Sequence, residues 1–347
     1  KRYLGNIITD TPTAPAGDVQ DDAASGVWSL AEANAYTAAG LWPRAGNLGP
    51  LGLFFGGEPG SGSDRTIMDY IVLASTGNAT DFGDLTVGAN ETSGSGSSTR
   101  GLASGGHSGT GRINVIQYMT YATLGNATDF GDLSSAAQRT ASGNNDTRSL
   151  IALGNTSSYI NTIDYVTISS AGNALDFGNL TNAREASCGM SSPTRTVFSG
   201  GFNGANYLNT SDYVTTATTG NATDFGDMTR GLRFCGAAGS NTRGIVAGGY
   251  ESSIVGQNDI IQYITFASTG NFTDFGDLAQ GAEGGAGVSN STRAIYALGE
   301  AVGHWSSSTP IEYVTIASVG NSTDFGDLSA ARRFIGGSSS ANGGLAA

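Results

Sequence analysis

The chain has 347 residues, of which 54 are Gly, 38% are apolar and only 13% are charged. Its formal net charge of −13 would repel phosphate backbones and anionic lipids, which argues against nucleic acid and membrane surfaces as partners. No run of roughly 18 apolar residues occurs, so no membrane-spanning helix is predicted. Short clusters of Val, Ile, Leu, Phe and Tyr recur between the glycines, a pattern typical of many short strands joined by tight turns.

Residues 1–50 form an N-terminal extension whose composition differs from that of the rest of the chain. Within it, Ser29 and Glu32 have the spacing of a capping box, with Ser29 as the N-cap and Glu32 as its reciprocal partner. A short helix is therefore expected from Ser29 to about Ala39, where Gly40 ends it.

Trp28 and Trp42 bracket this expected helix. Two Trp side chains around about three helical turns make a compact apolar anchor. Two interpretations stay open: the extension packs under the following domain as a cap, or it is a docking peptide that inserts into a neighbouring subunit.

Residues 51–347 are built from a repeat. The phrase Gly-Asn-x-x-Asp-Phe-Gly-Asp-Leu occurs six times with small variations, and its copies start at Gly77, Gly125, Gly172, Gly220, Gly270 and Gly320. Successive copies are 48, 47, 48, 50 and 50 residues apart. Repeats of about 40–50 residues are typical of propeller blades with four strands. The sequence predicts an all-β fold, a six-bladed β-propeller.

Each repeat divides into four expected strands. The first follows a Thr-Arg pair and ends in small residues, as in Arg100–Gly106. The second alternates around a Tyr, as in Asn114–Thr123, and the Gly-Asn pair then suits a two-residue hairpin loop with positive φ angles. The third is Thr-Asp-Phe-Gly-Asp-Leu, and a weaker fourth strand, rich in Ala, Gly and Ser, leads to the next Thr-Arg.

Length variation is confined to one part of the repeat. From the Leu or Met that closes each phrase to the next Thr-Arg there are always 14 residues, whereas from that Thr to the next Gly-Asn there are 26, 25, 26, 28 and 28. The loop between the first and second strands therefore varies on a constant scaffold, which is how a rigid platform presents a binding face.

The candidate binding residues lie in these variable loops and are aromatic or hydrogen-bonding side chains that suit glycan or protein contacts. They are His107, Arg112, Tyr159, Phe202, Tyr207, Tyr250, His304 and Trp305. The alternative interpretation is that they pack locally within their own loops.

The two ends of the repeat region leave a second blade count open. Pro50–Gly57 has the pattern of a first strand without its Thr-Arg, and Asn342–Ala347 resembles the opening of another repeat. Six complete units favour six blades, and the alternative is a seventh blade completed jointly by both ends.

The two acids of each phrase, such as Asp81 and Asp84, raise the question of a metal site. One Asp with turn carbonyls could bind Ca²⁺. We favour a structural role, in which these carboxylates cap turn amides or pair with the recurrent Arg, because Asn179 replaces one acid without disturbing the phrase. No metal or other cofactor is predicted.

Catalysis has little support in the residue types present. His107 and His304 are the only histidines, and no Ser-His-Asp or His-metal spacing is visible, so no catalytic residue is predicted. Cys188 and Cys235 are expected to be buried thiols that do not form a disulfide, because strand alternation at adjacent registers should point them to opposite faces.

The repeats resemble kelch repeats, in which a hydrophobic run ending in Gly-Gly is followed by an aromatic residue. Such pairs occur at Gly56-Gly57, Gly105-Gly106, Gly200-Gly201 and Gly248-Gly249, with Tyr70, Tyr118, Tyr213 and Tyr263 following. Phe82 and its equivalents stand where kelch has Trp, and two repeats read Leu-Gly, at Leu153-Gly154 and Leu298-Gly299. The resemblance covers Leu51 to about Ala347 and implies a kelch-like propeller.

Two segments of the extension, Gly26–Leu30 and Ala39–Pro43, are similar to virion structural proteins of tailed phages of cyanobacteria and other marine bacteria, and so is the repeated phrase. This resemblance implies a virion tail, tail-fibre or capsid-surface component. It would form a homo-oligomer, bind other virion proteins through its N-terminal segment and attach to a host-surface glycan or protein. The alternative is a secreted or cell-surface bacterial propeller that binds glycan or forms an extracellular appendage.

Overall fold

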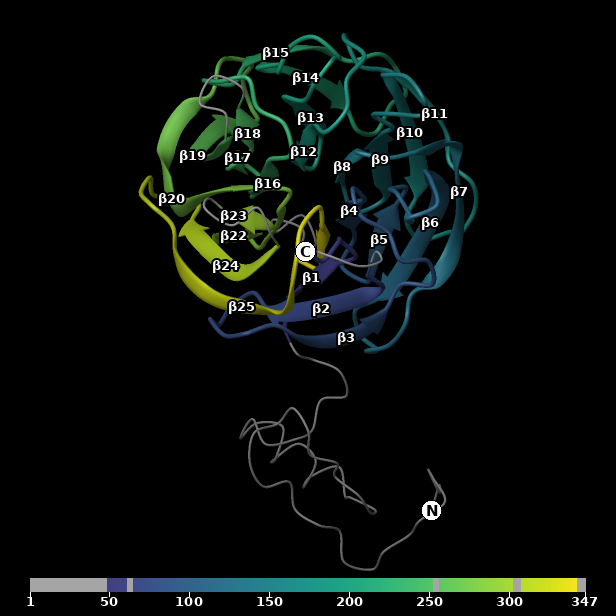
Figure 1. Cartoon of the computed structure of the whole chain (residues 1–347). Coiled ribbons are helices and arrows are strands. Elements are labelled where there is room, and N and C mark those ends of the chain that lie inside the picture. Colours follow the sequence, from purple (N-terminus) through teal and green to yellow (C-terminus); the bar gives the residue numbers. More distant parts are fainter. Residues whose placement is uncertain (1–48, 61–64, 252–255, 302–306, 342–347) are drawn as a thin grey trace, which may run out of the picture. The chain divides into compact units, whose positions relative to one another are not determined.

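Six antiparallel sheets surround a central axis in the computed structural model, which describes residues 49–60, 65–251, 256–301 and 307–341 (Figure 1). The prediction of a six-bladed, all-β propeller is confirmed, and no seventh sheet occurs in the described ranges. Those ranges also contain no helix that could cross a membrane. The expected helix after Ser29, the anchor residues Trp28 and Trp42, and the loop residues His304 and Trp305 lie outside the described residues.

The strands of each blade follow one another from the central channel to the outer rim. From the innermost strand outward, blade 1 is β26 (Gly336–Ser339), β1 (Leu51–Phe55), β2 (Ile67–Val72) and β3 (Thr80–Asp84). Blade 2 is β4 (Ser93–Gly96), β5 (Arg100–Ser104), β6 (Ile113–Thr120) and β7 (Thr128–Ala137). Blade 3 is β8 (Ala141–Asn144), β9 (Arg148–Ala152), β10 (Thr162–Thr167) and β11 (Leu175–Asn179).

The second half of the ring follows the same order. Blade 4 is β12 (Cys188–Ser191), β13 (Arg195–Ser199), β14 (Thr210–Thr215) and β15 (Thr223–Asp227). Blade 5 is β16 (Gly236–Gly239), β17 (Arg243–Ala247), β19 (Gly256–Thr265) and β20 (Thr273–Glu283), with the short β18 (Tyr250–Glu251) and β23 (Glu300–Ala301) added to it. Blade 6 is β21 (Ala286–Ser289), β22 (Arg293–Ala297), β24 (Ser308–Thr315) and β25 (Thr323–Arg332).

The blade is offset from the sequence repeat by one strand. The weak Ala-, Gly- and Ser-rich strand that ends each repeat becomes the innermost strand of the following blade. The last of these, β26, pairs with β1 from Gly52↔Ser339 to Phe55↔Gly336, so both ends of the repeat region complete blade 1. The joint completion that suggested a seventh blade therefore builds the first one.

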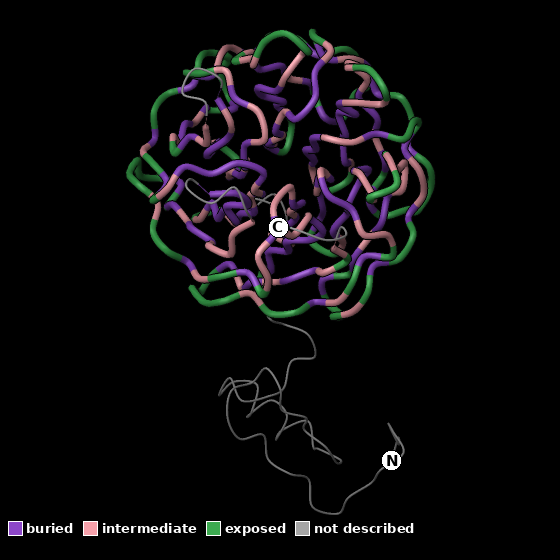
Figure 2. Tube along the Cα trace, viewed as in Figure 1, coloured by how far each residue is buried: buried purple, intermediate pink, exposed green. Residues whose placement is uncertain are grey.

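The core lies between the blades, and exposed residues gather on the outer rim (Figure 2). In every blade the recurrent Tyr packs edge-on against the Phe of Asp-Phe-Gly, with ring centroids 5.8–6.3 Å apart. In blades 2–6 the Arg of Thr-Arg lies 4.8–4.9 Å from the centre of that Tyr ring. Each such Arg donates to a carbonyl of the next blade, as Arg195 does to Phe266. The predicted pairing of this Arg with the Asp of the phrase is wrong.

The repeated phrase joins neighbouring blades. Gly125 N donates to Phe82 O at 2.8 Å, and Asp84 N donates to Asn126 Oδ1 at 3.0 Å. The same two bonds occur at all six junctions, including Gly77 to Phe325 across the closure. The Gly-Asn pair is therefore not a two-residue hairpin loop, because it lies in a longer connection that reaches the outer strand of the preceding blade.

We expect Gly131→Ala to destabilise the propeller by about 2–3 kcal/mol, because the new Cβ would lie 2.4 Å from Gly172 O of the next blade. Gly125→Ala is the matched control, since Gly125 has nearly the same φ (+146° against +147°) and its Cβ would meet nothing within 4 Å. Chemical denaturation followed by circular dichroism measures both variants. Equal destabilisation would mean that backbone strain alone makes these glycines necessary.

Candidate binding face

The variable loops occupy residues 56–66, 105–112, 153–161, 200–209, 248–255 and 298–307, between the second and third strands of each blade. The second strand of each blade ends where its variable loop begins. The innermost strand runs antiparallel to that second strand, so it begins at the same end of the propeller as the loops. We call this end the variable face. Of the residues that were predicted to bind a ligand, it carries the six that the structure describes and, beside them, the mouth of the central channel.

Four of the predicted binding residues form one continuous row across blades 3, 4 and 5. Ring centroids are 5.9 Å apart for Tyr159 and Phe202, 5.1 Å for Phe202 and Tyr207, and 5.7 Å for Tyr207 and Tyr250. All four side chains are half-buried. We call these four residues the aromatic row.

Arg233, which was not among the predicted binding residues, lies among these rings. Its guanidinium carbon is 5.8 Å from the ring centre of Phe202 and 5.2 Å from those of Tyr207 and Tyr250. A signal was available, because the equivalent position holds four different residue types in the six repeats although the 14-residue segment around it has a constant length. The six residues at this position are Asn90, Gln138, Glu185, Arg233, Glu283 and Arg333.

His107 and Arg112 lie on the variable face but make contacts within and beside their own loop. His107 Nδ1 accepts a hydrogen bond from Gly109 N at 3.1 Å. Arg112 Nε donates to Asn155 Oδ1 at 3.1 Å, and Asn155 Nδ2 donates to Glu185 Oε2 at 2.7 Å. His107 thus bonds within its own loop, and Arg112 bonds to the loop of the next blade.

The mouth of the channel is encircled by main-chain hydrogen bonds between successive blades. Glu91 N donates to Phe334 O, Arg139 N to Glu91 O, and the series continues around the ring. Its donors and acceptors include Glu91, Arg139, Ala186, Phe234, Gly284, Phe334 and Ile335. Five of these residues have left-handed φ angles of 54–57°: Glu91, Arg139, Ala186, Phe234 and Phe334. This circle of bonds surrounds the entrance to a cavity of about 100 Å³.

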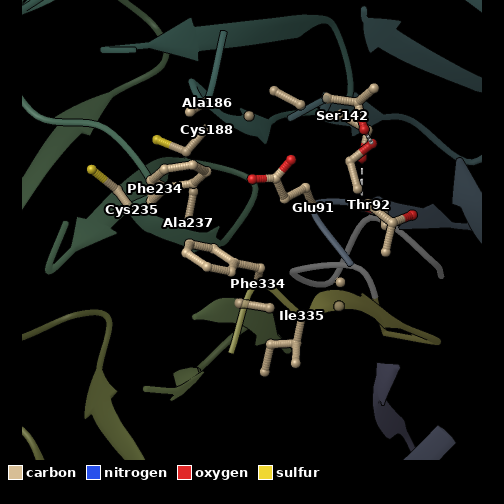
Figure 3. Close-up of a pocket in the computed structure, with 18 of the residues that line it drawn as sticks. Glu91, Thr92, Ser142, Ala186, Cys188, Phe234, Cys235, Ala237, Phe334 and Ile335 are labelled. Atoms are coloured by element: carbon tan, nitrogen blue, oxygen red, sulfur yellow. Dashed lines mark hydrogen bonds between the residues drawn. The ribbon is translucent and has the colours of Figure 1, made fainter. Parts of the chain in front are cut away.

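Charged and aromatic side chains line this cavity (Figure 3). Arg139 forms ion pairs with Glu91 at 2.8 Å and with Glu185 at 2.5 Å. Burial raises the pKa of Glu91, and Arg139 opposes that shift. Phe234 and Phe334 lie side by side with ring centroids 4.8 Å apart. The positive charge of Arg139 is thus paired within the protein.

Cys188 and Cys235 both line this cavity, so the prediction that they point to opposite faces is wrong (Figure 3). Cys188 begins β12, and Cys235 comes just before β16, on neighbouring innermost strands. Both are buried free thiols, as predicted. The neighbouring Cys188 thiol and burial raise the pKa of Cys235.

The acids of the repeated phrase do not gather into a metal site. Asp84 is exposed and accepts a hydrogen bond from Thr66 Oγ1 at 2.7 Å, and Asp327 accepts one from Thr309 in the same way. Among the described residues, no group of three or more His, Cys, Asp or Glu side chains could hold a metal ion.

Glu283 belongs to a buried carboxylate pair on the variable face. Gln257 Nε2 donates to Glu283 Oε1 and to Glu300 Oε1, both at 3.3 Å. Burial, together with the charge of Glu300, raises the pKa of Glu283 to about 7, while Arg233, Arg333 and the bond from Gln257 lower it. The folded protein therefore keeps this carboxyl protonated at a pH where the unfolded chain has lost the proton.

We expect the propeller to lose stability as the pH rises from 5 to 8. A raised carboxyl pKa contributes stability that is complete below the ordinary value of 4.5 and is lost as the pH rises through about 7. The loss is on the order of 3 kcal/mol. In Glu283→Gln this part of the pH dependence should disappear, whereas Asp259→Asn, at an exposed carboxylate, should keep the wild-type profile. Melting temperatures across this range measure it, and identical profiles for all three proteins would contradict the assignment.

No known protein family matches this chain, and no curated protein matches it either. A propeller supports many unrelated functions, so function has to be inferred from the site itself.

Proposed function

We propose that this chain is a kelch-like recognition propeller that binds a host-surface glycan on its variable face and does not turn it over. The aromatic row carries this proposal. The C–H face of a sugar ring packs on aromatic side chains, and the Tyr hydroxyls can bond to sugar hydroxyls. Successive ring centroids are 5.1–5.9 Å apart, so the four rings form a continuous apolar strip that a sugar chain can contact.

The scaffold supports the same role. Main-chain bonds join the blades at both the outer rim and the channel mouth, so the loops project from a rigid frame. Preorganised aromatic side chains lose little conformational freedom on binding, which favours affinity. The loops differ in length, so such a face could be adapted to another ligand without changing the frame.

Tyr207 is the centre of the row, since it contacts Phe202, Tyr250 and Arg233. We expect Tyr207→Ala to weaken binding of the full-length protein to purified host polysaccharide at least about tenfold, as for a central interface aromatic. Leu175→Ala is the control, because Leu175 is 60% exposed and lies at the start of outer strand β11, away from the row. Biolayer interferometry measures both. Unchanged affinity in Tyr207→Ala would refute glycan binding on the row, and shortened polysaccharide after incubation would refute binding without turnover.

We further propose that the protein is a structural component of a phage virion, as a tail, tail-fibre or capsid-surface part. The similarity of its N-terminal segments and of its repeated phrase to virion proteins supports this. Residues 1–50, with Trp28 and Trp42, would attach the propeller to other virion proteins, and several copies would present their variable faces to the host.

Deleting residues 1–45 tests this attachment. We expect the truncated protein to be absent from purified particles and to retain polysaccharide binding, because the row lies in the propeller. Incorporation of the truncated protein into particles would overturn the attachment. Detection of the full-length protein only on bacterial surfaces or in particle-free culture medium would favour a secreted or cell-surface propeller instead.

A further inference from the structure

We infer that Arg233 makes the aromatic row selective for a saccharide that bears a carboxylate. This inference rests on the proposed glycan binding and adds the chemical class of the ligand. It comes from a comparison of two arginines that occupy the same position in different repeats, Arg233 and Arg333.

The two arginines have the same main-chain setting. Arg333 exchanges two main-chain hydrogen bonds with Glu58, and Arg233 exchanges two with Tyr250. The residue after each has a left-handed φ, 54° for Phe334 and 57° for Phe234. Both side chains therefore start from an equivalent, fixed point of the ring.

Their side-chain partners differ in kind. Arg333 forms ion pairs with Glu58 at 2.5 Å and with Glu300, so its charge is neutralised within the protein. Tyr250 stands at the repeat position of Glu58, and Phe202 stands at that of Glu300. Arg233 contacts the rings of these two residues. The same frame thus holds two carboxylates around one arginine and two aromatic rings around the other.

Arg233 has no carboxylate partner among the described residues. No described Asp or Glu lies within ion-pair distance of it, and its buried Nε has no hydrogen-bond partner. The charge of Arg233 lowers the pKa of Glu283, but the Glu283 carboxyl accepts its hydrogen bond from Gln257 and forms no ion pair with Arg233. Cation–π contacts with the surrounding rings stabilise the positive charge of this half-buried guanidinium, and its N–H groups can still donate hydrogen bonds to a ligand.

A carboxylate is the group whose geometry matches this unpaired fork, because it can accept two parallel N–H bonds. An acidic sugar brings that group together with an apolar ring face, and the two would meet Arg233 and the aromatic row together. General attraction of anions is disfavoured by the net charge of −13, so an acidic saccharide that binds would do so through this site.

The test uses the full-length protein and three probes: an oligogalacturonate, the same oligosaccharide with its carboxyls reduced to neutral galactose, and a sulfated galactan of equal length. We expect the oligogalacturonate to bind at least tenfold more tightly than the other two. Arg233→Gln should bind the oligogalacturonate no more tightly than the neutral probe, and Tyr207→Ala should weaken binding of all three. Arg112→Gln removes one positive charge from an exposed side chain of the same face and should keep the preference.

Isothermal titration calorimetry measures the affinities, and melting curves verify that each variant is folded. Equal binding of the acidic and neutral probes, or a preference that survives in Arg233→Gln, would overturn the inference and leave glycan binding in place. Equal binding of the sulfated probe and the uronate would overturn selectivity for carboxylate. Failure of all three probes to bind would overturn both proposals.

Discussion

Removal of residues 336–347 is expected to abolish the folded propeller. This truncation deletes β26, the innermost strand of blade 1, whose partner β1 comes from the other end of the repeat region. Without it, the edge of β1 from Gly52 to Phe55 loses its ladder of hydrogen bonds. Buried main-chain groups left without partners cost free energy comparable to lost hydrogen bonds, and the four residue pairs between β1 and β26 are lost together.

The deleted strand also contacts both neighbouring blades. Ser338 Oγ accepts a hydrogen bond from Tyr121 of blade 2 at 3.0 Å, and Ser339 Oγ donates to Ser289 O of blade 6 at 3.0 Å. Phe55 packs beside Gly336 and would be uncovered. A folded domain has only about 5–15 kcal/mol of stability, which the loss of these contacts together should exceed.

Truncation after Ala341 is the control, because it leaves β26 complete. Circular dichroism and size-exclusion chromatography measure the outcome: an expanded, unfolded chain for the longer deletion and a wild-type elution volume for the shorter one. A cooperative melt of the longer deletion near the wild-type temperature would show that closure contributes little.

Arg332→Met is expected to cost about 3–5 kcal/mol of stability, the usual effect of removing one partner from a buried ion pair. Arg332 Nη2 lies 2.9 Å from Asp69 Oδ2 and 3.1 Å from Phe54 O, and both charged side chains are fully buried. Arg332 ends β25 of blade 6, whereas Asp69 belongs to blade 1. The substitution would leave a buried carboxylate with only its bonds from Ser329.

Arg184 and Asp212 form the same pair at the junction of blades 3 and 4, with 3.1 Å between Arg184 Nη2 and Asp212 Oδ2. Arg184→Met is therefore the matched comparison for the same loss away from the closure. Denaturant unfolding should give similar costs for both variants. In Arg332→Met/Asp69→Asn, where the unpaired charge is gone, part of the stability should return. A cost below about 1 kcal/mol for Arg332→Met would contradict the assigned role.

The buried pairs belong to a longer period that the sequence already contains. Asp69 and Asp212 occupy one position in blades 1 and 4, Gln117 and Gln262 occupy it in blades 2 and 5, and Leu-Gly replaces Gly-Gly in blades 3 and 6. Gln117 and Gln262 each accept hydrogen bonds from a Thr that lies two residues after the outer strand of the preceding blade. Blades 1 and 4 therefore share one polar contact at this position, and blades 2 and 5 share another.

Sequence reasoning found the residues of the aromatic row but not their contacts with one another. Tyr159, Phe202, Tyr207 and Tyr250 were recognisable because each lies in a loop that varies in length on a constant frame. Arg233 was missed because it lies in the segment of constant length, where a charged residue is expected to be an ordinary solvent-exposed side chain. Its importance depends on rings from the variable loops of blades 4 and 5, the two blades that its own segment connects.

The sequence by itself favoured six blades and identified the repeat and the loops that vary in length. These are local properties, since strand periodicity, turn residues and repeat length can all be recognised within a stretch of about 50 residues. Only the tertiary structure decided which blade the weak strand joins, why the phrase contains Gly and Asn, and that both thiols face the channel. Those features depend on hydrogen bonds and close approaches between neighbouring blades, or across the closure between residues nearly 290 positions apart. No pattern within a single repeat specifies such a contact.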